Sequence, residues 1–334
     1  MNQHKDNSTA VLQNEIRVLE FRKESFEVFF HYFEDEKLGI QYTTTKLDEL
    51  NMTQLLNKYR EKHNLPFPEE IKNIRERYGL SASKMSDILG FGANTYRQYE
   101  AGEVPSGANA KIIRMAEDPS KFLSLVEMCE EIEDDFKTKL SVRIKEMIKE
   151  HGGWIRIPLG GDPFAEYIKP SAVNGYKKPD INKFSNVIKR IAERVKPYKT
   201  GLNKLLFYID FAHYKRHGHS ITGCEYSAIQ MGPVPNWFES TYERLAEKNE
   251  FDLNYVSLPD GNYGVRFKAR KDSPFDEALF SLEELQTIDE VIKLLGNKQA
   301  KDLIDISHEE TAWLENYEEK NLIAYDFAFA LKAV

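Results

Sequence analysis

LPFPEEIKNIRERYGLSASKMSDILGFGANTYRQYEAG, residues 65–102, is the stretch that decides how the N-terminal half of this chain folds. Its first part carries apolar residues at three- and four-residue spacing, namely Ile71, Ile74 and Tyr78. This spacing predicts an amphipathic helix over residues 68–78, with a proline in its first turn and a glycine just past its end.

A second and a third helix are expected within the same stretch. Ser81 or Ser83 can cap the second helix, because a serine hydroxyl accepts a hydrogen bond from a backbone N–H of the first turn. Gly90 and Gly92 then break the chain before a third helix over residues 93–101. Short helices around a glycine-containing turn are typical of a helix-turn-helix motif.

The third helix carries polar side chains of the kind that read DNA bases. Tyr96 and Tyr99 are spaced to pack inward, which leaves four residues outward: Asn94, Thr95, Arg97 and Gln98. In the major groove Asn and Gln can pair with adenine, and Arg with guanine. Lys84 and Arg75 are candidates for phosphate contacts.

The alternative is that these polar residues only form the solvated face of a small helical bundle. The shortness of the helices and the glycine-bounded turn argue against it. Residues 66–120 contain seven Lys/Arg and eight Asp/Glu, so DNA binding must rely on the local placement of charge. A homodimer would double the phosphate contacts, and we therefore expect a dimer on operator DNA.

The segments YREKHNLPFPEEIKNIRERYGLS and ILGFGANTYRQYEAG make residues 57–118 resemble the helix-turn-helix half of MqsA-type antitoxins. The resemblance implies that Asn94 and Gln98, with Arg97 between them, contact operator bases. Members of that family often carry an N-terminal zinc module built from paired CxxC motifs, and this chain departs from the family there.

The chain has two cysteines, Cys129 and Cys224, and neither lies in a CxxC pair or near the N-terminus. We therefore expect no metal and no other cofactor. Residues 16–45 alternate apolar and polar side chains, which predicts a small antiparallel β unit in place of a zinc module. Two well-separated thiols without a secretory signal indicate a reducing compartment, so a cytoplasmic protein is expected.

Length and composition favour several domains. A chain of 334 residues predicts two or three, and a hydrophobic content of 41% supports sizeable cores. No apolar run approaches the roughly 18 residues that a membrane-spanning helix needs, so no membrane partner is expected. The net charge of −8 argues against general coating of nucleic acid and favours either solubility or a basic protein partner.

Residues 121–150 carry apolar side chains at spacings of three and four, which predicts a long amphipathic helix or a pair of helices. Their apolar face could form a core, a dimer contact or a docking surface for a partner helix. HGGWIRIPLGGDP, residues 151–163, and KPSAVNGYKKPD, residues 169–180, cannot form one regular element, and we place a domain boundary there.

The C-terminal half alternates helical and strand patterns. Apolar spacing predicts a helix that starts near residue 202 and ends at Gly218, followed by a turn at residues 220–223, a strand over residues 226–230 and a helix from about residue 236. Alternating residues on both sides of PDGN predict a β-hairpin. Apolar helices are expected at the end of the chain, over residues 282–295, 300–306 and 322–331.

This half resembles the Panacea, or SocA-like, domain over residues 182–334. The motifs that carry the resemblance are LNKLLFYIDFAHYKRHGHSITG, YSAIQMGPVP and SHEETAW. Such domains are fused to varied DNA-binding modules in antitoxins, so the resemblance implies a cognate toxin encoded by an adjacent gene as the partner. Exposed candidates for toxin contact are Tyr214, Lys215, Arg216 and Trp237. Core packing is the alternative for Trp237.

Seven residues of this half have side chains used in metal ligation or acid–base catalysis: Asp210, His213, His217, His219, His308, Glu309 and Glu310. Their spacing forms no HExxH pattern, and the sequence has no P-loop and no nucleophile elbow. We therefore expect the histidines to be structural, and the chain not to be an enzyme.

The predicted fold class is α+β and predominantly helical. The expected parts are a β unit at residues 1–56, a helix-turn-helix domain at 57–120, a connector at 121–169 and a Panacea domain at 170–334. The predicted function is that of an antitoxin that neutralises a toxin by direct binding and represses its own operon. The alternative is a transcription regulator whose C-terminal domain senses a ligand or acts as a proteolytic adaptor.

Overall fold

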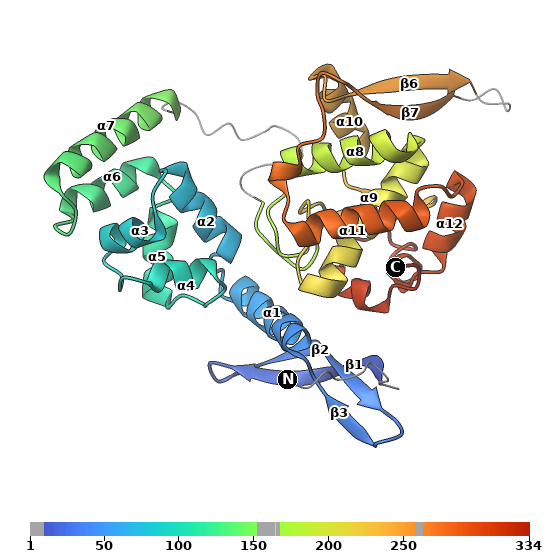
Figure 1. The fold of residues 1–334 in the computed structure, drawn as a ribbon, viewed down its shortest axis with the longest axis horizontal. Coiled ribbons are helices and arrows are strands. Elements are labelled where there is room, and N and C mark those ends of the chain that lie inside the picture. The colour runs from blue at the N-terminus through green and yellow to red at the C-terminus, as the bar shows by residue number, and fades with distance from the viewer. Residues whose placement is uncertain (1–9, 152–163, 165–167, 258–262) are drawn as a thin grey trace, which may run out of the picture. The chain divides into compact units, whose positions relative to one another are not determined.

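The structure, a computed structural model, describes residues 10–151, 164, 168–257 and 263–334. The chain divides into two compact units (Figure 1). Met1–Leu55 and Gly160–Val334 form the first unit, and Leu56–Leu159 form the second. The described elements are mostly helices with small antiparallel sheets, which confirms the predicted fold class.

The N-terminal β unit is confirmed as a three-stranded antiparallel sheet in the order β1 (Val11–Phe21), β2 (Glu24–Asp35) and β3 (Ile40–Tyr42). β1 pairs with β2 along its entire length, from Val11 opposite Glu34 to Phe21 opposite Glu24. The two residues that join these strands, Arg22 and Lys23, have φ angles of 49° and 67°. Two left-handed residues in succession match a tight turn to the twist of the strands.

Helix α1 (Thr45–Lys62) covers part of the edge of β2 that faces away from β1. The side-chain amide of Asn51 accepts from the backbone N–H of His31 at 2.8 Å and donates to its carbonyl at 2.9 Å. Gln54 makes the same two bonds to the backbone of Phe29, at 3.0 and 2.9 Å. The two amides therefore take the place that a neighbouring strand would occupy.

The second unit is helical (Figure 1). Its helices are α2 (Pro68–Arg77), α3 (Ala82–Leu89), α4 (Thr95–Glu100), α5 (Gly107–Met115), α6 (Pro119–Met128) and α7 (Asp134–His151). The expected first and second helices are confirmed, with Ser81 as the N-cap of α3 and left-handed Gly90, at φ 68°, as its C-cap. The third helix is shorter than expected.

One core joins helices α2, α3 and α4 to the connector helices α6 and α7. The Tyr78 ring stacks on Phe122 with ring centroids 4.0 Å apart, and the Tyr96 hydroxyl donates to the carbonyl of Ile71 at 2.7 Å. The buried connector residues in this core are Phe122, Val126, Cys129, Ile132, Leu140 and Ile144. Of the alternatives for residues 121–150, the pair of helices is confirmed, and its apolar face packs into this core.

The C-terminal part surrounds a central helix, α9 (Lys199–His217), which is buried from Gly201 to Tyr214. The other elements are α8 (Ile181–Val195), β4 (Tyr226–Ile229), β5 (Gly232–Pro235), α10 (Phe238–Glu247), β6 (Phe251–Ser257), β7 (Tyr263–Ala269), the 3₁₀ helix Glu277–Leu279, α11 (Leu282–Leu295), α12 (Ala300–His308), α13 (Thr311–Leu314) and the 3₁₀ helix Tyr325–Ala330. Helices α8, α11 and α12, strand β5 and the last 3₁₀ helix all pack against α9.

The α-helix expected over residues 322–331 is wrong, because only the 3₁₀ helix Tyr325–Ala330 forms there. The backbone at its start bonds to distant segments: the N–H of Ile323 donates to the Tyr226 carbonyl at 2.8 Å, and that of Tyr325 to the Ala172 carbonyl at 2.9 Å. The hairpin is confirmed by the antiparallel pairing of β6 and β7, while residues 258–262 at its turn lie outside the described residues, as do residues 152–163 of the expected boundary.

None of the helices in the described part of the chain has the length and the hydropathy required for crossing a bilayer.

Candidate functional site

The surface of α4 carries the residues expected to read DNA. Tyr96 and Tyr99 are buried, as predicted, and the Ser86 hydroxyl fixes the start of the helix by accepting from the backbone N–H of Tyr96 at 3.1 Å. This leaves Asn94, Arg97 and Gln98 exposed and Thr95 half-buried. The exposed group can form hydrogen bonds with an outside partner without disturbing the core.

The two residues expected to contact phosphates are already engaged. Arg75 donates to both carboxylate oxygens of Glu100, at 2.5 and 3.3 Å, and to the carbonyl of Leu80 at 2.8 Å. The hydrogen bond to Glu100 raises the pKa of Arg75. A phosphate would compete with this ion pair, which ties α2 to α4. Lys84 is half-buried, with its Nζ atom 3.7 Å from Asp87.

The expectation that Tyr214 is exposed is wrong. Its side chain is fully buried and its hydroxyl donates to Asp326 at 2.7 Å, because the last 3₁₀ helix covers this end of α9. Lys215 is half-buried and donates to the backbone carbonyls of Leu331 and Val334 at 3.0 and 2.8 Å. Arg216 is exposed and forms an ion pair with Glu290 at 2.6 Å.

Trp237 is the exposed aromatic residue of the expected toxin surface. Its side chain is 60% exposed, so the alternative of core packing is wrong. It precedes α10 with φ 55°, a left-handed conformation that is costly for a residue with a bulky side chain. Asn236 holds the adjoining backbone by donating to the Glu225 carbonyl at 2.9 Å. An exposed tryptophan on a fixed turn is suited to anchor a protein partner.

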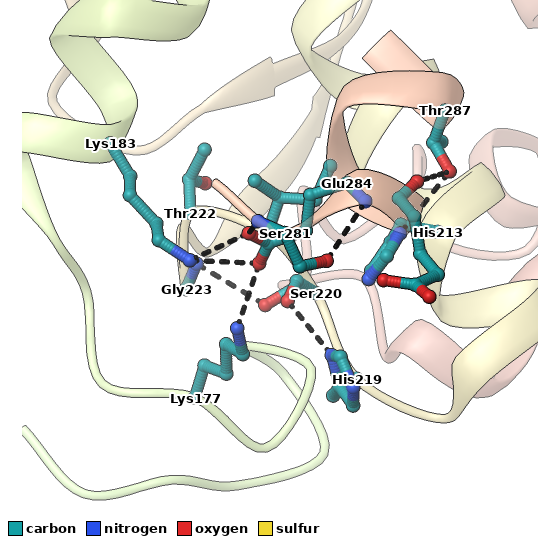
Figure 2. A network of polar contacts seen from close by, with 12 residues as sticks. Lys177, Lys183, His213, His219, Ser220, Thr222, Gly223, Ser281, Glu284 and Thr287 are labelled. Carbon is teal, nitrogen blue, oxygen red and sulfur yellow. Dashed lines mark hydrogen bonds and ion pairs between the residues drawn. The ribbon is translucent and has the colours of Figure 1, made fainter. Parts of the chain in front are cut away.

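A buried ion network joins the loop before α8 to the start of α11 (Figure 2). Lys177 and Lys183 both contact the Glu284 carboxylate, at 3.1 and 2.8 Å from the same oxygen. Burial raises the pKa of Glu284, but the two lysines outweigh it and lower that pKa to about 2. Glu284 also accepts from the N–H of Ser281, so the network and the cap of α11 share one carboxylate.

Three histidines gather beside this network. The ring of His213 stacks on His217 with centroids 4.4 Å apart and lies 5.1 Å from that of His219. The Nδ1 atom of His213 lies 3.2 Å from the Thr287 hydroxyl, while its buried Nε2 atom has no hydrogen-bond partner among the described residues. Burial lowers the pKa of all three imidazoles, that of His219 to about 3, so they are neutral near pH 7.

These histidines border a cavity of about 450 Å³, whose opposite wall is the N-terminal half of α1, with Lys46, Glu49, Leu50 and Thr53. Within the described ranges, however, no group of three His, Cys, Asp or Glu side chains could hold a metal ion. The cavity therefore has the polar lining of a small-molecule site without the ligand geometry of a metal centre.

The carboxylates considered for catalysis hold the fold together. Asp210 accepts from the N–H groups of Ile221 and Thr222, both at 2.9 Å, and from the hydroxyl of Tyr226 at 2.8 Å. Glu310 accepts from the Tyr208 hydroxyl at 3.2 Å and from the backbone at the C-terminus. Asp210 therefore fixes the turn at residues 221–222, and Glu310 fixes the C-terminal segment at residues 332–333.

The remaining two candidates lie at the end of α12. His308 stacks on the indole of Trp313, with ring centroids 3.8 Å apart, and Glu309 accepts at its carbonyl from the Lys332 ammonium at 2.6 Å. These contacts give both residues packing and bonding roles at the C-terminal segment.

Two charged residues, Glu284 and Lys204, are buried although no sequence pattern indicates it. Lys204 is fully buried on α9, donates to the carbonyl of Pro233 at 2.8 Å and has its pKa lowered to about 7 by burial. A charged residue in a sequence is expected on a solvated face by default. The burial of these two could not be predicted, because their contact partners come from distant segments of the chain.

Comparison with known proteins bears on the C-terminal part. No curated protein and no solved structure matches the chain. A family model described as the antitoxin SocA-like Panacea domain matches residues 202–314, from the central helix α9 to α13. This match supports a C-terminal Panacea domain and, in general terms, an antitoxin role for the chain.

Proposed function

We propose that this chain is an antitoxin that binds and neutralises a toxin through its Panacea domain and represses its own operon through the helix-turn-helix. The match of residues 202–314 to an antitoxin family carries the first half of the proposal. The exposed Asn94, at the N-cap of α4, and Arg97 and Gln98 on that helix support the second half, because they leave a polar surface free beside a closed core.

For operator binding, the three side chains of α4 would contact base edges from within the major groove. The weak overall charge of residues 66–120 favours a dimer on an inverted repeat, since two copies double the contacts with phosphates. Lys84 can turn from Asp87 to a phosphate at small cost, as its 3.7 Å ion pair is partly exposed.

For toxin binding, Trp237 and Arg216 are the remaining candidates of the original four. Both lie on the surface of the C-terminal part, and neither is needed to fill its core. An aromatic anchor and an arginine are the residue types that contribute most at protein interfaces. The neutralised toxin is expected to be the product of an adjacent gene.

The experiment is growth of cells that express the neighbouring gene, with and without this chain supplied in trans. Rescue of growth, together with a stable stoichiometric complex of the two purified proteins, supports the antitoxin function. A harmless neighbour, or toxicity that persists with well-expressed and folded chain, contradicts it. Operator binding is measured separately on the promoter fragment of the same operon.

The second candidate is a transcription regulator that senses a small ligand. The specific observation in its favour is the 450 Å³ cavity with the unpartnered Nε2 atom of His213. A sensor is expected to change its operator affinity when the ligand is added, whereas an antitoxin forms a stable complex with the neighbouring gene product.

A further inference from the structure

Within the described part of the chain, strand β1 has one open edge and one exposed apolar face. Among the described residues it pairs only with β2, and it forms one side of the sheet. Leu12, Ile16 and Val18 are 51%, 62% and 62% exposed, and they alternate along the strand so that they share a face. A long apolar edge strand of this kind is prone to pair with another strand.

The bonds on β2 determine which groups of β1 point to the open edge. The peptide N–H and C=O of Phe29 and His31 are taken by the amides of α1, on the side away from β1. Phe29 and His31 lie opposite Ile16 and Asn14, so these are non-hydrogen-bonded pairs. The peptide groups of Ile16 and Asn14 therefore point outward. By alternation the same holds for Leu12, Val18 and Glu20.

We propose that β1 pairs antiparallel with β1 of a second copy of this chain, about a two-fold axis through Ile16. This register overlaps the whole of Val11–Phe21, with Val11 opposite Phe21 of the second copy. It also sets outward-pointing residues against each other, Asn14 against Val18 and Leu12 against Glu20, as an antiparallel ladder requires. The result is about ten new backbone hydrogen bonds and a continuous six-stranded sheet.

Charge selects this register over its neighbours. With Ile16 on the axis, Glu15 of each copy lies directly opposite Arg17 of the other, in a non-hydrogen-bonded pair where the side chains are closest. Within one copy the two side chains are already 2.7 Å apart. Two adjacent registers also keep the outward-pointing peptide groups opposite each other, and they place the axis at Glu15 or at Arg17. The first sets Glu15 opposite Glu15 of the second copy and the second sets Arg17 opposite Arg17, so both put like charges together, which is unfavourable.

The opposite side of the sheet explains why association stops at two copies. There the Asn51 and Gln54 amides occupy the edge of β2 beside Phe29 and His31, so a further strand cannot add to them. Beyond them β3 pairs with β2, and its three residues, Ile40–Tyr42, offer too short an edge for a second ladder of this kind. The contact is then isologous and closed rather than fibre-forming. This dimer is the one that the proposed operator binding calls for, but the pairing rests on β1 alone and does not depend on DNA or toxin binding.

The first test is a charge exchange in the full-length protein, read by sedimentation equilibrium. Glu15→Arg puts arginines at positions 15 and 17, and Arg17→Glu puts glutamates at both, so each variant alone should self-associate at least about tenfold more weakly than wild type. Mixed together, the two variants should form a heterodimer, because every cross-strand pair is then attractive. The exposed Glu36→Arg and Lys37→Glu are matched controls off β1.

The second test is a cysteine cross-link. Ile16→Cys should form a disulfide between two copies, since residues on the axis of such a pair lie about 5.5 Å apart between Cα atoms. Leu12→Cys, on the same face, should not, because its counterpart lies at the far end of the ladder. The native Cys129 and Cys224 are buried.

The proposal is overturned if wild-type protein stays monomeric at high concentration, if the single charge variants associate as wild type does, or if the Leu12→Cys cross-link forms as readily as that of Ile16→Cys. Circular dichroism of each variant checks that its fold is kept. Operator and toxin binding are measured on the same samples, so that failure of the proposed function is distinguished from failure of the pairing.

Discussion

Lys183 Nζ lies 2.8 and 2.9 Å from the two carboxylate oxygens of Glu284, and this contact ties α8 to α11 across 101 residues of chain. Lys177 adds a second ammonium group 3.1 Å from the same carboxylate. All three side chains are largely buried, and the Glu284 carboxylate contacts both ammonium groups. Removing one partner of a buried ion pair is strongly destabilising, because that contact no longer offsets the burial of the remaining charge.

Replacement of Glu284 by Gln should therefore lower the free energy of unfolding by about 3 kcal/mol. Urea denaturation of the full chain, with a signal that reports on unfolding of the C-terminal part, measures this change in the free energy of unfolding. The exposed neighbour Glu283→Gln is the matched control and should change stability little. Equal effects of the two substitutions would show that the network contributes nothing.

The same carboxylate predicts an acid limit for stability. Its pKa in the folded protein is about 2, below the ordinary value of 4.5, so the stabilisation is complete above pH 4.5 and is lost as the pH falls toward 2. The free energy of unfolding of the wild-type protein, measured by urea denaturation at each pH, should fall steeply between pH 4.5 and 2, and that of Glu284→Gln should fall less. If the two proteins showed the same dependence of stability on pH, the ion network would not be its source.

The three histidines predict a second loss of stability at milder pH. Their pKa values are lowered in the folded state, that of His219 to about 3, mainly by burial. Below pH 6.5 the unfolded chain therefore takes up protons that the folded chain does not, and stability falls as the pH falls. Between pH 7.5 and 5.0, His219→Gln should remove on the order of 1 kcal/mol of this loss. The exposed His63→Gln serves as control.

Alanine at Asn94, Arg97 or Gln98 should weaken operator binding by about 1–3 kcal/mol each, because each removes hydrogen bonds to a base edge. Titration of promoter DNA at fixed salt measures the change, and Asn73→Ala, exposed on α2, is the control. Toxin neutralisation should stay intact. If one of these variants lost neutralisation with DNA binding unchanged, the proposed division of labour between the two units would be wrong.

Trp237→Ala should weaken the toxin complex by about 2–4 kcal/mol, as expected for an exposed aromatic anchor. The free energy of unfolding of the free chain should stay the same or rise slightly. Trp237 fills no core position, and the smaller alanine is less crowded in the left-handed backbone conformation of this residue. Calorimetric titration with the purified toxin gives the affinity. Leu282→Ala, 73% exposed on α11, is the matched control; an equal loss there would argue against a specific role for Trp237.

Local elements followed from the sequence because their causes are local. The spacing of Ile71, Ile74 and Tyr78, the serine at 81 and the glycine at 90 are enough to predict α2, α3 and the turn after them. In the same way the apolar pattern of residues 282–295 predicts α11 with its bounds. The 3₁₀ form of Tyr325–Ala330 escaped prediction, since the backbone at its start bonds to Tyr226 and Ala172, which lie far away in the chain.

The helix-turn-helix pattern, the small β unit, the helical C-terminal part and the resemblance of that part to an antitoxin domain could all be read from the residues in order along the chain. The burial of Tyr214, the ion pair of Arg75 with Glu100, the exposure of Trp237 and the meeting of Lys177, Lys183 and Glu284 became visible only in the folded chain. Periodicity and capping act within a few residues, whereas burial and ion pairing depend on segments that lie far apart in the chain.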